Sequence, residues 1–209
     1  MSKQNAPPGQ FDAESDLSLG ELHDELIREV QDTVYPPGRR VQISLACFCV
    51  ARDHHYAIAA MLEERRFASV FALLRPIFEA TVKGSWLAHC GTDSDAERLY
   101  TGKELSQVGD LLDQLLVSPL PPLLSQALKD IKVRYWRTLS SFAHAGSSQV
   151  RRWVKPEGVG PIYSDEELQE ATNFTAFMAV VASLESARLG NNEKAISVLS
   201  MRLAQVESH

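Results

Sequence analysis

The chain has 209 residues, of which 44% are hydrophobic and 23% are charged, and its formal net charge is −6 at pH 7. This length and composition are typical of one globular domain with a sizeable core, and they exclude a collagen-like or wholly disordered chain. No apolar run approaches the length of about 20 residues that a bilayer span requires, so we expect no membrane partner.

The first residues, 1–16, are polar and proline-rich and contain no apolar segment of the kind found in secretory signals. This composition predicts a disordered leader over 1–16, followed by a single helical-bundle domain over 17–209. The three cysteines, Cys47, Cys49 and Cys90, are an odd number without a secretory signal. We therefore expect them to be buried, apolar side chains in a cytoplasmic protein.

Helical periodicity begins at Ser18, which stands three residues before Glu21, the spacing of a capping box. Pro36 and Pro37 end this first helix. A second helix is expected over 39–64 and a third over 67–90, joined by the short connection EERRF. The short connection predicts an antiparallel hairpin of two long helices.

Four further helices follow along the chain. The fourth is expected to begin at Ser94, with Glu97 completing a capping box, and to run towards SPLPP; the fifth ends at Gly146. Ser164 begins a sixth helix that ends at Gly190, and a short seventh covers 191–206. No segment alternates at the period of a β-strand. The sequence therefore predicts an all-α fold, an antiparallel helical bundle of about six to seven helices.

The third expected helix is apolar on most sides, which favours a central position in the bundle. Its charged residues, Arg75, Glu79 and Lys83, are four positions apart and share one face, and Pro76 interrupts the backbone hydrogen bonding. One interpretation is a solvent-facing stripe of ion pairs; the other is a buried polar cluster at a functional site. In the hairpin, His55 and Arg75 are equidistant from the turn, so we expect His55 to lie opposite Arg75.

The fifth expected helix carries the segment RYWRTLSSFAHAG. Leu139 and Phe142 belong to its core stripe, together with Leu74 and Phe78 of the third helix. Arg137 and His144 project within about 20° of each other on the opposite face, about 10.5 Å apart along the axis, and Ser141 lies nearby. The pair could flank a phosphate group. The alternative is that both side chains belong to a solvated surface.

The segment 129–155 carries seven basic residues against one acid, a net charge of +6, so the rest of the chain carries −12. Arg134 and Arg137 belong to this segment, and aromatic residues are interleaved with its charges. A basic patch with aromatic side chains is typical of a surface that binds RNA or another anion. The alternative is that the segment packs against an acidic helix of the same molecule, such as SDEELQE at 164–170.

Two resemblances are carried by these segments. Arg137 and His144 fit the R-x4–6-H motif of the HEPN superfamily, helical bundles that include metal-independent RNases of toxin–antitoxin and phage-defence systems. In addition, ASVFALLRPIFEATVKGSWLAHC followed by YWRTLSSFAHAG resembles an uncharacterised bacterial family of HEPN-like helical proteins, whose hallmark is a helix reading R-P-x-F-E-A. The resemblances imply a HEPN-like fold over most of residues 40–190.

In active HEPN proteins the Arg and His of two subunits form a composite cleft. The resemblance therefore implies a homodimer in which Arg137 steadies the scissile phosphate and His144 assists attack by the ribose 2′-hydroxyl, with a cognate antitoxin protein as a further partner. A histidine with a near-neutral pKa suits such acid–base chemistry.

Two classes of function remain open. The first is a metal-independent endoribonuclease of the HEPN kind, or a degenerate relative of one. The second is a non-catalytic helical module that binds a protein partner or a small anion through Arg75, Glu79 and His144. The sequence contains no H-E-x-x-H motif, Walker loop, Rossmann glycine pattern or G-x-S-x-G elbow, so we expect neither a metal nor a cofactor.

Overall fold

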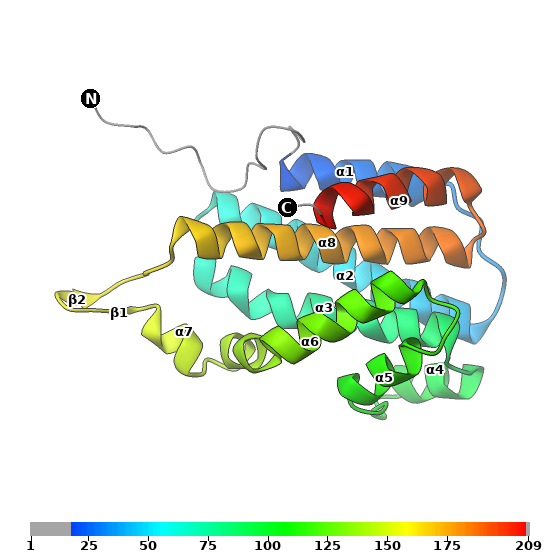
Figure 1. Cartoon of the computed structure of the whole chain (residues 1–209), viewed down its shortest axis with the longest axis horizontal. Helices are drawn as coiled ribbons and strands as arrows, with labels where there is room; N and C mark the ends of the chain where they lie inside the picture. The colour runs from blue at the N-terminus through cyan, green and yellow to red at the C-terminus, as the bar shows by residue number, and fades with distance from the viewer. Residues whose placement is uncertain (1–17, 208–209) are drawn as a thin grey trace.

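The computed structural model describes residues 18–207, so the leader expected over 1–16 lies outside the described residues. In this part of the chain the secondary structure consists of helices and one two-stranded ribbon (Figure 1). In chain order the elements are α1 (Leu19–Val30), α2 (Arg39–Glu63), α3 (Phe67–His89), α4 (Asp93–Tyr100), α5 (Val108–Leu115), α6 (Pro122–Ala143), α7 (Ser147–Arg151), β1 (Val154–Lys155), β2 (Gly158–Val159), α8 (Asp165–Leu189) and α9 (Glu193–Glu207).

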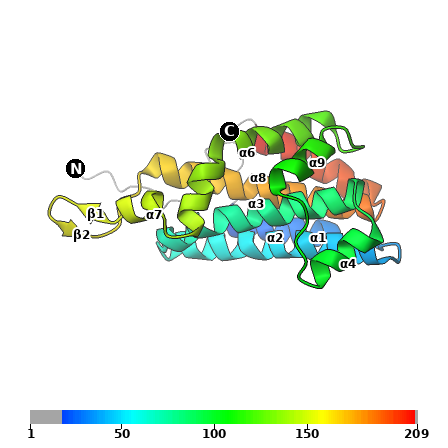
Figure 2. The same cartoon turned by 90° about the horizontal axis from the view of Figure 1, so that it is seen from below.

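The expected all-α helical bundle is confirmed. Helices α1, α3 and α8 run in one direction and α2, α6 and α9 in the other, so neighbours along the chain are mostly antiparallel (Figure 1). Helix α3 packs against α2, α5, α6 and α8, which confirms its central position. The two strands pair antiparallel, with Val154 opposite Val159, in a small ribbon that projects beyond the helices (Figures 1 and 2).

Capping residues explain where several helices begin. The capping boxes expected at Ser18 and Ser164 are both formed. The capping box expected at Ser94 is formed two residues earlier. The Thr92 hydroxyl accepts a hydrogen bond from the Asp95 amide, and α4 begins directly after Thr92. The expected fourth helix is also divided in two. The backbone turns at Gly102, where φ is +76°, a conformation that favours glycine, and α5 begins only at Val108.

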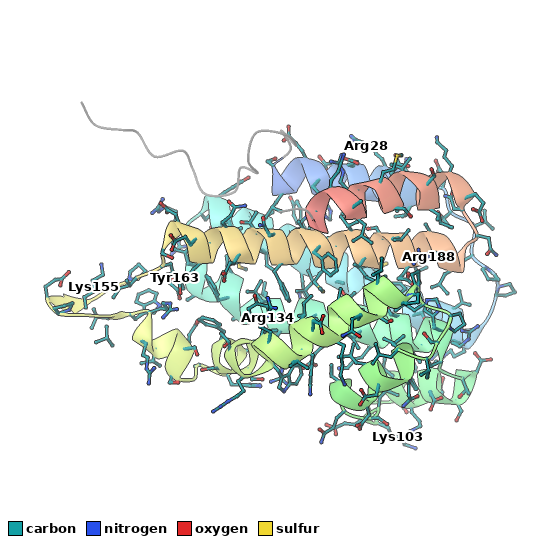
Figure 3. The ribbon with its side chains drawn as sticks, viewed as in Figure 1. Arg28, Lys103, Arg134, Lys155, Tyr163 and Arg188 are labelled. Atoms are coloured by element: carbon teal, nitrogen blue, oxygen red, sulfur yellow. The ribbon has the colours of Figure 1, made fainter. Side chains whose placement is uncertain are left out.

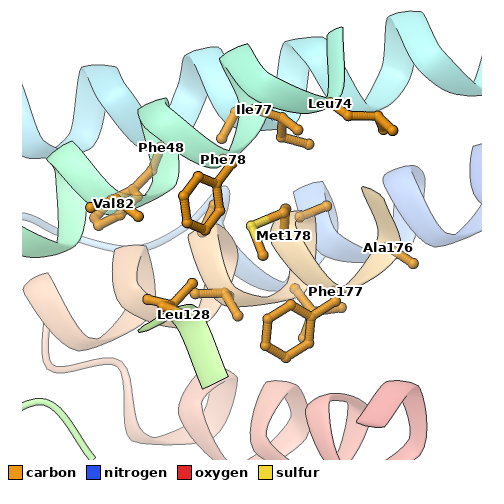
Figure 4. Packing of buried hydrophobic residues seen from close by; sticks show 14 of the residues in the cluster. Phe48, Leu74, Ile77, Phe78, Val82, Leu128, Ala176, Phe177 and Met178 are labelled. Carbon is orange, nitrogen blue, oxygen red and sulfur yellow. The ribbon is translucent and has the colours of Figure 1, made fainter. Parts of the chain in front are cut away.

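The core stripe expected from the sequence is confirmed. Leu74, Phe78, Leu139 and Phe142 are all buried, and they belong to one hydrophobic cluster that includes residues of α1 to α3 and α8. Figure 4 shows Phe78 of α3 facing Met178 of α8 in the middle of this cluster. Burial of each large apolar side chain stabilises the fold by about 1.5–3 kcal/mol, so the α3–α8 contact is a main source of stability.

A glycine sets how closely α2 and α3 approach each other. A Cβ atom added at Gly84 would lie 2.6 Å from Cε1 of Phe48 and 3.1 Å from Cβ of Cys47, both on α2. The first distance is shorter than any normal carbon–carbon contact, so a larger residue at this position requires the buried Phe48 ring or the helices themselves to shift. The missing side chain at position 84 therefore fixes the spacing of the α2–α3 hairpin.

Helix α8 is buried along most of its length and encloses one carboxylate. The Glu185 side chain is fully buried; its Oε2 lies 2.5 Å from Nε2 of His89, on α3, and its Oε1 lies 2.5 Å from Nη1 of Arg188. Both carboxylate oxygens thus have a partner. A buried charge is tolerated only when it is paired in this way, and the His89 contact ties the ends of α3 and α8 together.

Candidate functional site

The polar stripe of α3 and the end of α6 meet in one cluster. Nη1 of Arg75 lies 2.9 Å from Nε2 of His144. His144 is exposed and directly follows Ala143, the last residue of α6, where the backbone leaves the helix. Because a guanidinium group can only donate, Nε2 of His144 accepts this hydrogen bond and its proton is on Nδ1. Two groups that the sequence placed on separate helices thus form one site.

Three other side chains hold the Arg75 guanidinium in place. Its Nε donates to Oε1 of Glu79 at 2.7 Å, and Nη1 also donates to Oγ of Ser140 at 3.2 Å. Ser140 in turn donates to the carbonyl of Trp136, which orients its hydroxyl. The ring of Trp136 lies beneath the guanidinium, 4.5 Å from its Cζ. Stacking, an ion pair and hydrogen bonds together fix both the position and the plane of the cation.

The expected ion pairs along α3 are confirmed. Glu79 binds Arg75 through one oxygen and lies 3.3 Å from Nζ of Lys83 through the other. The side chains of Arg75 and Glu79 are 22% and 23% exposed, so the stripe is neither a fully solvated face nor a buried cluster. It lies in a partly covered position, which water or a small ligand can reach.

A cleft of about 650 Å³ opens beside the cluster, between α2, α3 and α4, and Arg75, Pro76 and His144 belong to its wall. The rest of the wall is mainly apolar and includes Cys47 and Tyr100. A second cleft, of about 430 Å³, lies on the other side of the stripe, next to Trp136. Arg75 lines both clefts, so a ligand in either one would contact the same guanidinium.

The cysteines differ from one another in their surroundings. Burial raises the pKa of the Cys47 thiol to about 11, so this thiol stays protonated at neutral pH. Cys49 is exposed, which contradicts the expectation that it is buried; its Sγ lies 3.3 Å from Nη2 of Arg52. The pattern of the sequence was misleading here because α2 is amphipathic only weakly, with apolar residues on its outer face as well.

The expectation that His55 lies opposite Arg75 was wrong. His55 is fully buried on another side of α2, where its Nε2 lies 3.2 Å from the carbonyl of Leu19 and its Nδ1 3.4 Å from Oγ1 of Thr175. Burial lowers the pKa of His55 to about 4, with a further contribution from His23. Equal distance from the hairpin turn sets the level of a residue along the bundle but not the face on which its side chain lies.

The other residues proposed from the fifth helix lie outside the cluster. Arg137 is exposed on α6 and makes no polar contact with another described residue. Arg134 is also exposed, with its Cζ 5.9 Å from the ring of Tyr135. Oγ of Ser141 accepts a hydrogen bond from the backbone N–H of Ser148, so this residue holds the start of α7. His144 is therefore paired with Arg75 and not with Arg137.

The basic segment 129–155 is partly neutralised within the molecule. Arg152 forms an ion pair with Glu167, which confirms for this residue the alternative that the segment contacts the acidic start of α8. Lys129 forms an ion pair with Asp113 of α5. Arg134, Arg137 and Arg151 remain exposed, and none of them has a carboxylate partner among residues 18–207. The segment thus keeps part of its positive field at the surface.

Two members of the cluster, Trp136 and Ser140, were missed as site residues. They stand at intervals of four before His144, so the three residues form one stripe along α6. The R-x6-H spacing selects Arg137 and His144 and leaves this stripe out. The spacing of four would have identified it, but the sequence did not indicate that the stripe meets α3.

Two properties of the described chain bear on its chemistry. Nowhere in residues 18–207 do three His, Cys, Asp or Glu side chains come together as metal ligands would. Over the same residues, the helices lack the combination of length and apolar character needed to span a bilayer.

Comparison with curated proteins and with solved structures gave no significant match. The match to a protein family is extensive: it covers residues 48–206, from α2 to α9, and includes Arg75, Glu79, Trp136, Ser140 and His144. The whole candidate site thus lies within the matched region, and the chain belongs to the family of unknown function DUF6988.

Proposed function

We propose that the Arg75–His144 cluster binds a phosphate group of RNA and that the chain is a metal-independent endoribonuclease. The observation that carries this proposal is the 2.9 Å contact between Nη1 of Arg75 and Nε2 of His144 at the wall of an open cleft. A fixed cation and an accessible imidazole are the two groups that phosphodiester cleavage without a metal requires.

Arg75 has donors to spare for a phosphate. A guanidinium carries five N–H groups. One binds Glu79 and the two on Nη1 face Ser140 and His144, which leaves both N–H groups of Nη2 without a polar partner among the described residues. Because Glu79 and Trp136 already hold the plane of the guanidinium, a phosphate would bind to a prearranged pair of donors.

His144 would move the proton in the reaction. Its Nε2 would leave Arg75 and accept the proton of the ribose 2′-hydroxyl while the 2′-oxygen forms a bond to phosphorus and the bond to the 5′-oxygen breaks. The departing 5′-oxygen takes up a proton from water, so the products are a 2′,3′-cyclic phosphate and a free 5′-hydroxyl. Arg75 would stabilise the charge that develops on the phosphate oxygens.

The surroundings of the site favour RNA over a small phosphate ester. Arg137 lies two turns before His144, on the outer side of α6, where it could bind a neighbouring phosphate of the same strand. Together with the resemblance to HEPN proteins, this favours a HEPN-like ribonuclease that acts in the cytoplasm, in a toxin–antitoxin or phage-defence system, as a homodimer with a cognate antitoxin protein.

A second candidate function is a non-catalytic module that binds a small anion or a protein partner. The specific observation in its favour is that Arg75 already occupies the Nε2 position of His144, and that Arg137 is not part of the cluster. In this case the site would bind phosphate without cutting RNA.

One experiment separates the two candidates. Purified protein is incubated with 5′-labelled single-stranded RNA in EDTA, and phosphate binding is measured in parallel by calorimetry. For the ribonuclease we expect fragments that end in a 2′,3′-cyclic phosphate, and we expect His144→Ala to abolish cleavage. A matched control is His54→Ala, because His54 is a partly buried histidine of α2 that does not line either cleft.

The outcomes have distinct meanings. Phosphate binding without cleavage by the unmodified protein would support the binding module and contradict the ribonuclease. Cleavage that persists in His144→Ala would point to a contaminating nuclease. If the protein neither binds phosphate nor cleaves RNA, the ribonuclease and the anion-binding module are both wrong, and a protein partner is what remains of the second candidate.

A further inference from the structure

An arm, formed by residues 150–163, projects from the helical bundle between α7 and α8. Both views show it extending beyond the helices, with Lys155 in the part farthest from them and Tyr163 where the chain returns to α8 (Figures 1, 2 and 3). The arm exposes a concentration of large apolar side chains: Val150, Trp153, Val154, Val159 and Ile162. Val159 is 85% exposed, as much as a residue of an unfolded segment. Such a concentration of apolar surface is typical of an interaction site.

The arm has a defined shape. Val154 and Val159 are partners across the β1–β2 ribbon, so their side chains lie on the same face. The Gly160 amide donates to the Trp153 carbonyl at 2.9 Å, and the Ile162 amide donates to the Arg152 carbonyl at 2.6 Å. The apolar face is therefore held in place by backbone hydrogen bonds, although none of the helices described in residues 18–207 covers it (Figures 1 and 2).

A groove of complementary character lies between α6 and α8. It has a volume of about 590 Å³, and its floor is built from aromatic and aliphatic side chains that include Phe71, Phe142 and Phe177. Two acidic residues at the start of α8, Glu167 and Glu170, belong to its wall. The arm, in contrast, carries Arg151, Arg152 and Lys155 against the single acid Glu157. Arg152 also lines the groove and neutralises Glu167, so Glu170 is the carboxylate that the rim offers to Arg151 and Lys155 of an arm. The groove thus offers an apolar floor and one acidic side chain to an apolar, positively charged segment.

We propose that the arm of one copy of this chain docks into the α6–α8 groove of a second copy. Each molecule carries both the arm and the groove, so the contact can be reciprocal. Two copies related by a two-fold axis would each insert an arm into the groove of the other. The ion pair between Arg152 and Glu167 ties the base of the arm to the edge of its own groove. A neighbouring arm would therefore enter close to the symmetry axis, where the two arms cross.

A protein groove suits the arm better than RNA does. Four of its five exposed apolar residues are aliphatic, and aliphatic side chains cannot stack on bases. A second copy is preferred over an unrelated partner because its groove has both the apolar floor and the acidic rim that the arm requires. The docking would bury the side chains of Val154 and Val159, which are exposed in the single chain.

The first test is the molar mass in solution, measured by light scattering after size-exclusion chromatography over a hundredfold range of concentration. We expect the unmodified chain to be a dimer and Val159→Asp to be a monomer with unchanged helicity and melting temperature. The matched control is Val117→Asp. Val117 is as exposed as Val159 but lies after α5, outside both the arm and the groove, so this variant should remain a dimer.

The second test addresses the groove. Glu170→Lys should weaken the dimer at least tenfold, because it places a positive charge where the arm is positive. Combination with Lys155→Glu should restore most of the affinity. In a Cys49→Ser background, Val159→Cys in one copy and Thr138→Cys in another should form an intermolecular disulfide only when the two proteins are mixed, since Thr138 lines the groove.

A chain that is monomeric at all concentrations would overturn the proposal, as would a dimer that Val159→Asp leaves intact. Loss of RNA binding in Trp153→Ala of a monomeric protein would assign the arm to RNA instead, and binding of the monomer to anionic vesicles would assign it to a lipid surface. None of the dimer measurements requires RNA or catalysis. Their result therefore does not depend on whether the chain cleaves RNA, although a monomer would also contradict the homodimer of the proposed function.

Discussion

Two clusters of this molecule are built from the same three residue types, one glutamate, one arginine and one histidine, yet they differ in what they can do. In the cluster between α3 and α8, the carboxylate of Glu185 is central and fully buried, and His89 and Arg188 occupy both of its oxygens. In the cluster between α3 and α6, Arg75 is central and partly exposed, and it contacts Glu79 and His144.

The difference lies in what remains available for a ligand. A carboxylate whose two oxygens are paired inside the core has no further role than to hold helices together. A central guanidinium has five donors, and at Arg75 the two on Nη2 are not used by the described residues. It also lies at the wall of two clefts. Burial and the choice of the central residue thus distinguish a structural cluster from a candidate binding site.

The largest expected effect is on the buried cluster. Glu185→Ala removes a fully buried carboxylate, which leaves a cavity in the core and takes the partner from Arg188 and His89, so we expect it to lower the free energy of unfolding by roughly 3–5 kcal/mol. Glu79→Ala should cost less, about 1 kcal/mol, since the Glu79 carboxylate is partly exposed and its removal leaves no buried cavity. Urea denaturation of both variants checks the comparison. Equal losses would contradict the distinction between the two clusters.

The next effect is the pH dependence of stability that His55 causes. Burial lowers the pKa of His55 to about 4 in the folded chain, below its ordinary value of 6.5. The contribution of neutral His55 to the free energy of unfolding is therefore fully present above pH 6.5. This contribution, roughly 3 kcal/mol, is lost as the pH falls towards 4. Urea denaturation between pH 7 and pH 4 measures it. His55→Asn should flatten this slope.

A smaller effect is expected for Arg75→Lys. Lysine keeps the charge but loses the planar pair of donors and the stacking on Trp136, so phosphate affinity should fall about tenfold, or about 1.4 kcal/mol. Calorimetric titration with inorganic phosphate checks this. Arg134→Lys is the matched control, because Arg134 is exposed and does not line the clefts. Unchanged affinity in Arg75→Lys would exclude Arg75 as a bidentate phosphate ligand.

The smallest effect is expected for the stability of His144→Ala. His144 is exposed and lies beyond the end of α6, so its removal should change the free energy of unfolding by less than about 0.5 kcal/mol. Any loss of cleavage or phosphate binding would then report on the site itself. A loss of stability similar to that of Glu185→Ala would show that His144 has a structural role.

Much of the fold could be predicted from the sequence because helix periods and capping residues are local signals. Ser18, Ser164 and the core positions Leu74 and Phe142 are examples. The end of the helix at Gly102 was not predicted, because a helix often continues through a single glycine in a helical pattern. Local signals thus identified the main helices but not every boundary between them.

The site could be predicted only in part. The charged stripe of α3 and His144 were both identified, but the angle at which α6 crosses α3 decides that they meet. This crossing angle follows from the packing of buried residues that are far apart in the sequence. The spacing of residues within one helix does not reveal that packing. For the same reason His55 was expected near Arg75, although its side chain lies on another side of α2.

The close approach of α2 and α3 at Gly84 has a consequence for the cleft beside Arg75 and His144. Cys47, which the missing Cβ at position 84 would contact, lines the same cleft as Arg75 and His144. A methyl group at Gly84 would displace Phe48 or push the two helices apart, and a separation of the helices would widen the cleft without changing any residue of its wall. On the proposal that the cleft binds a ligand, the size of ligand that fits is therefore set in part by a residue that the ligand does not touch.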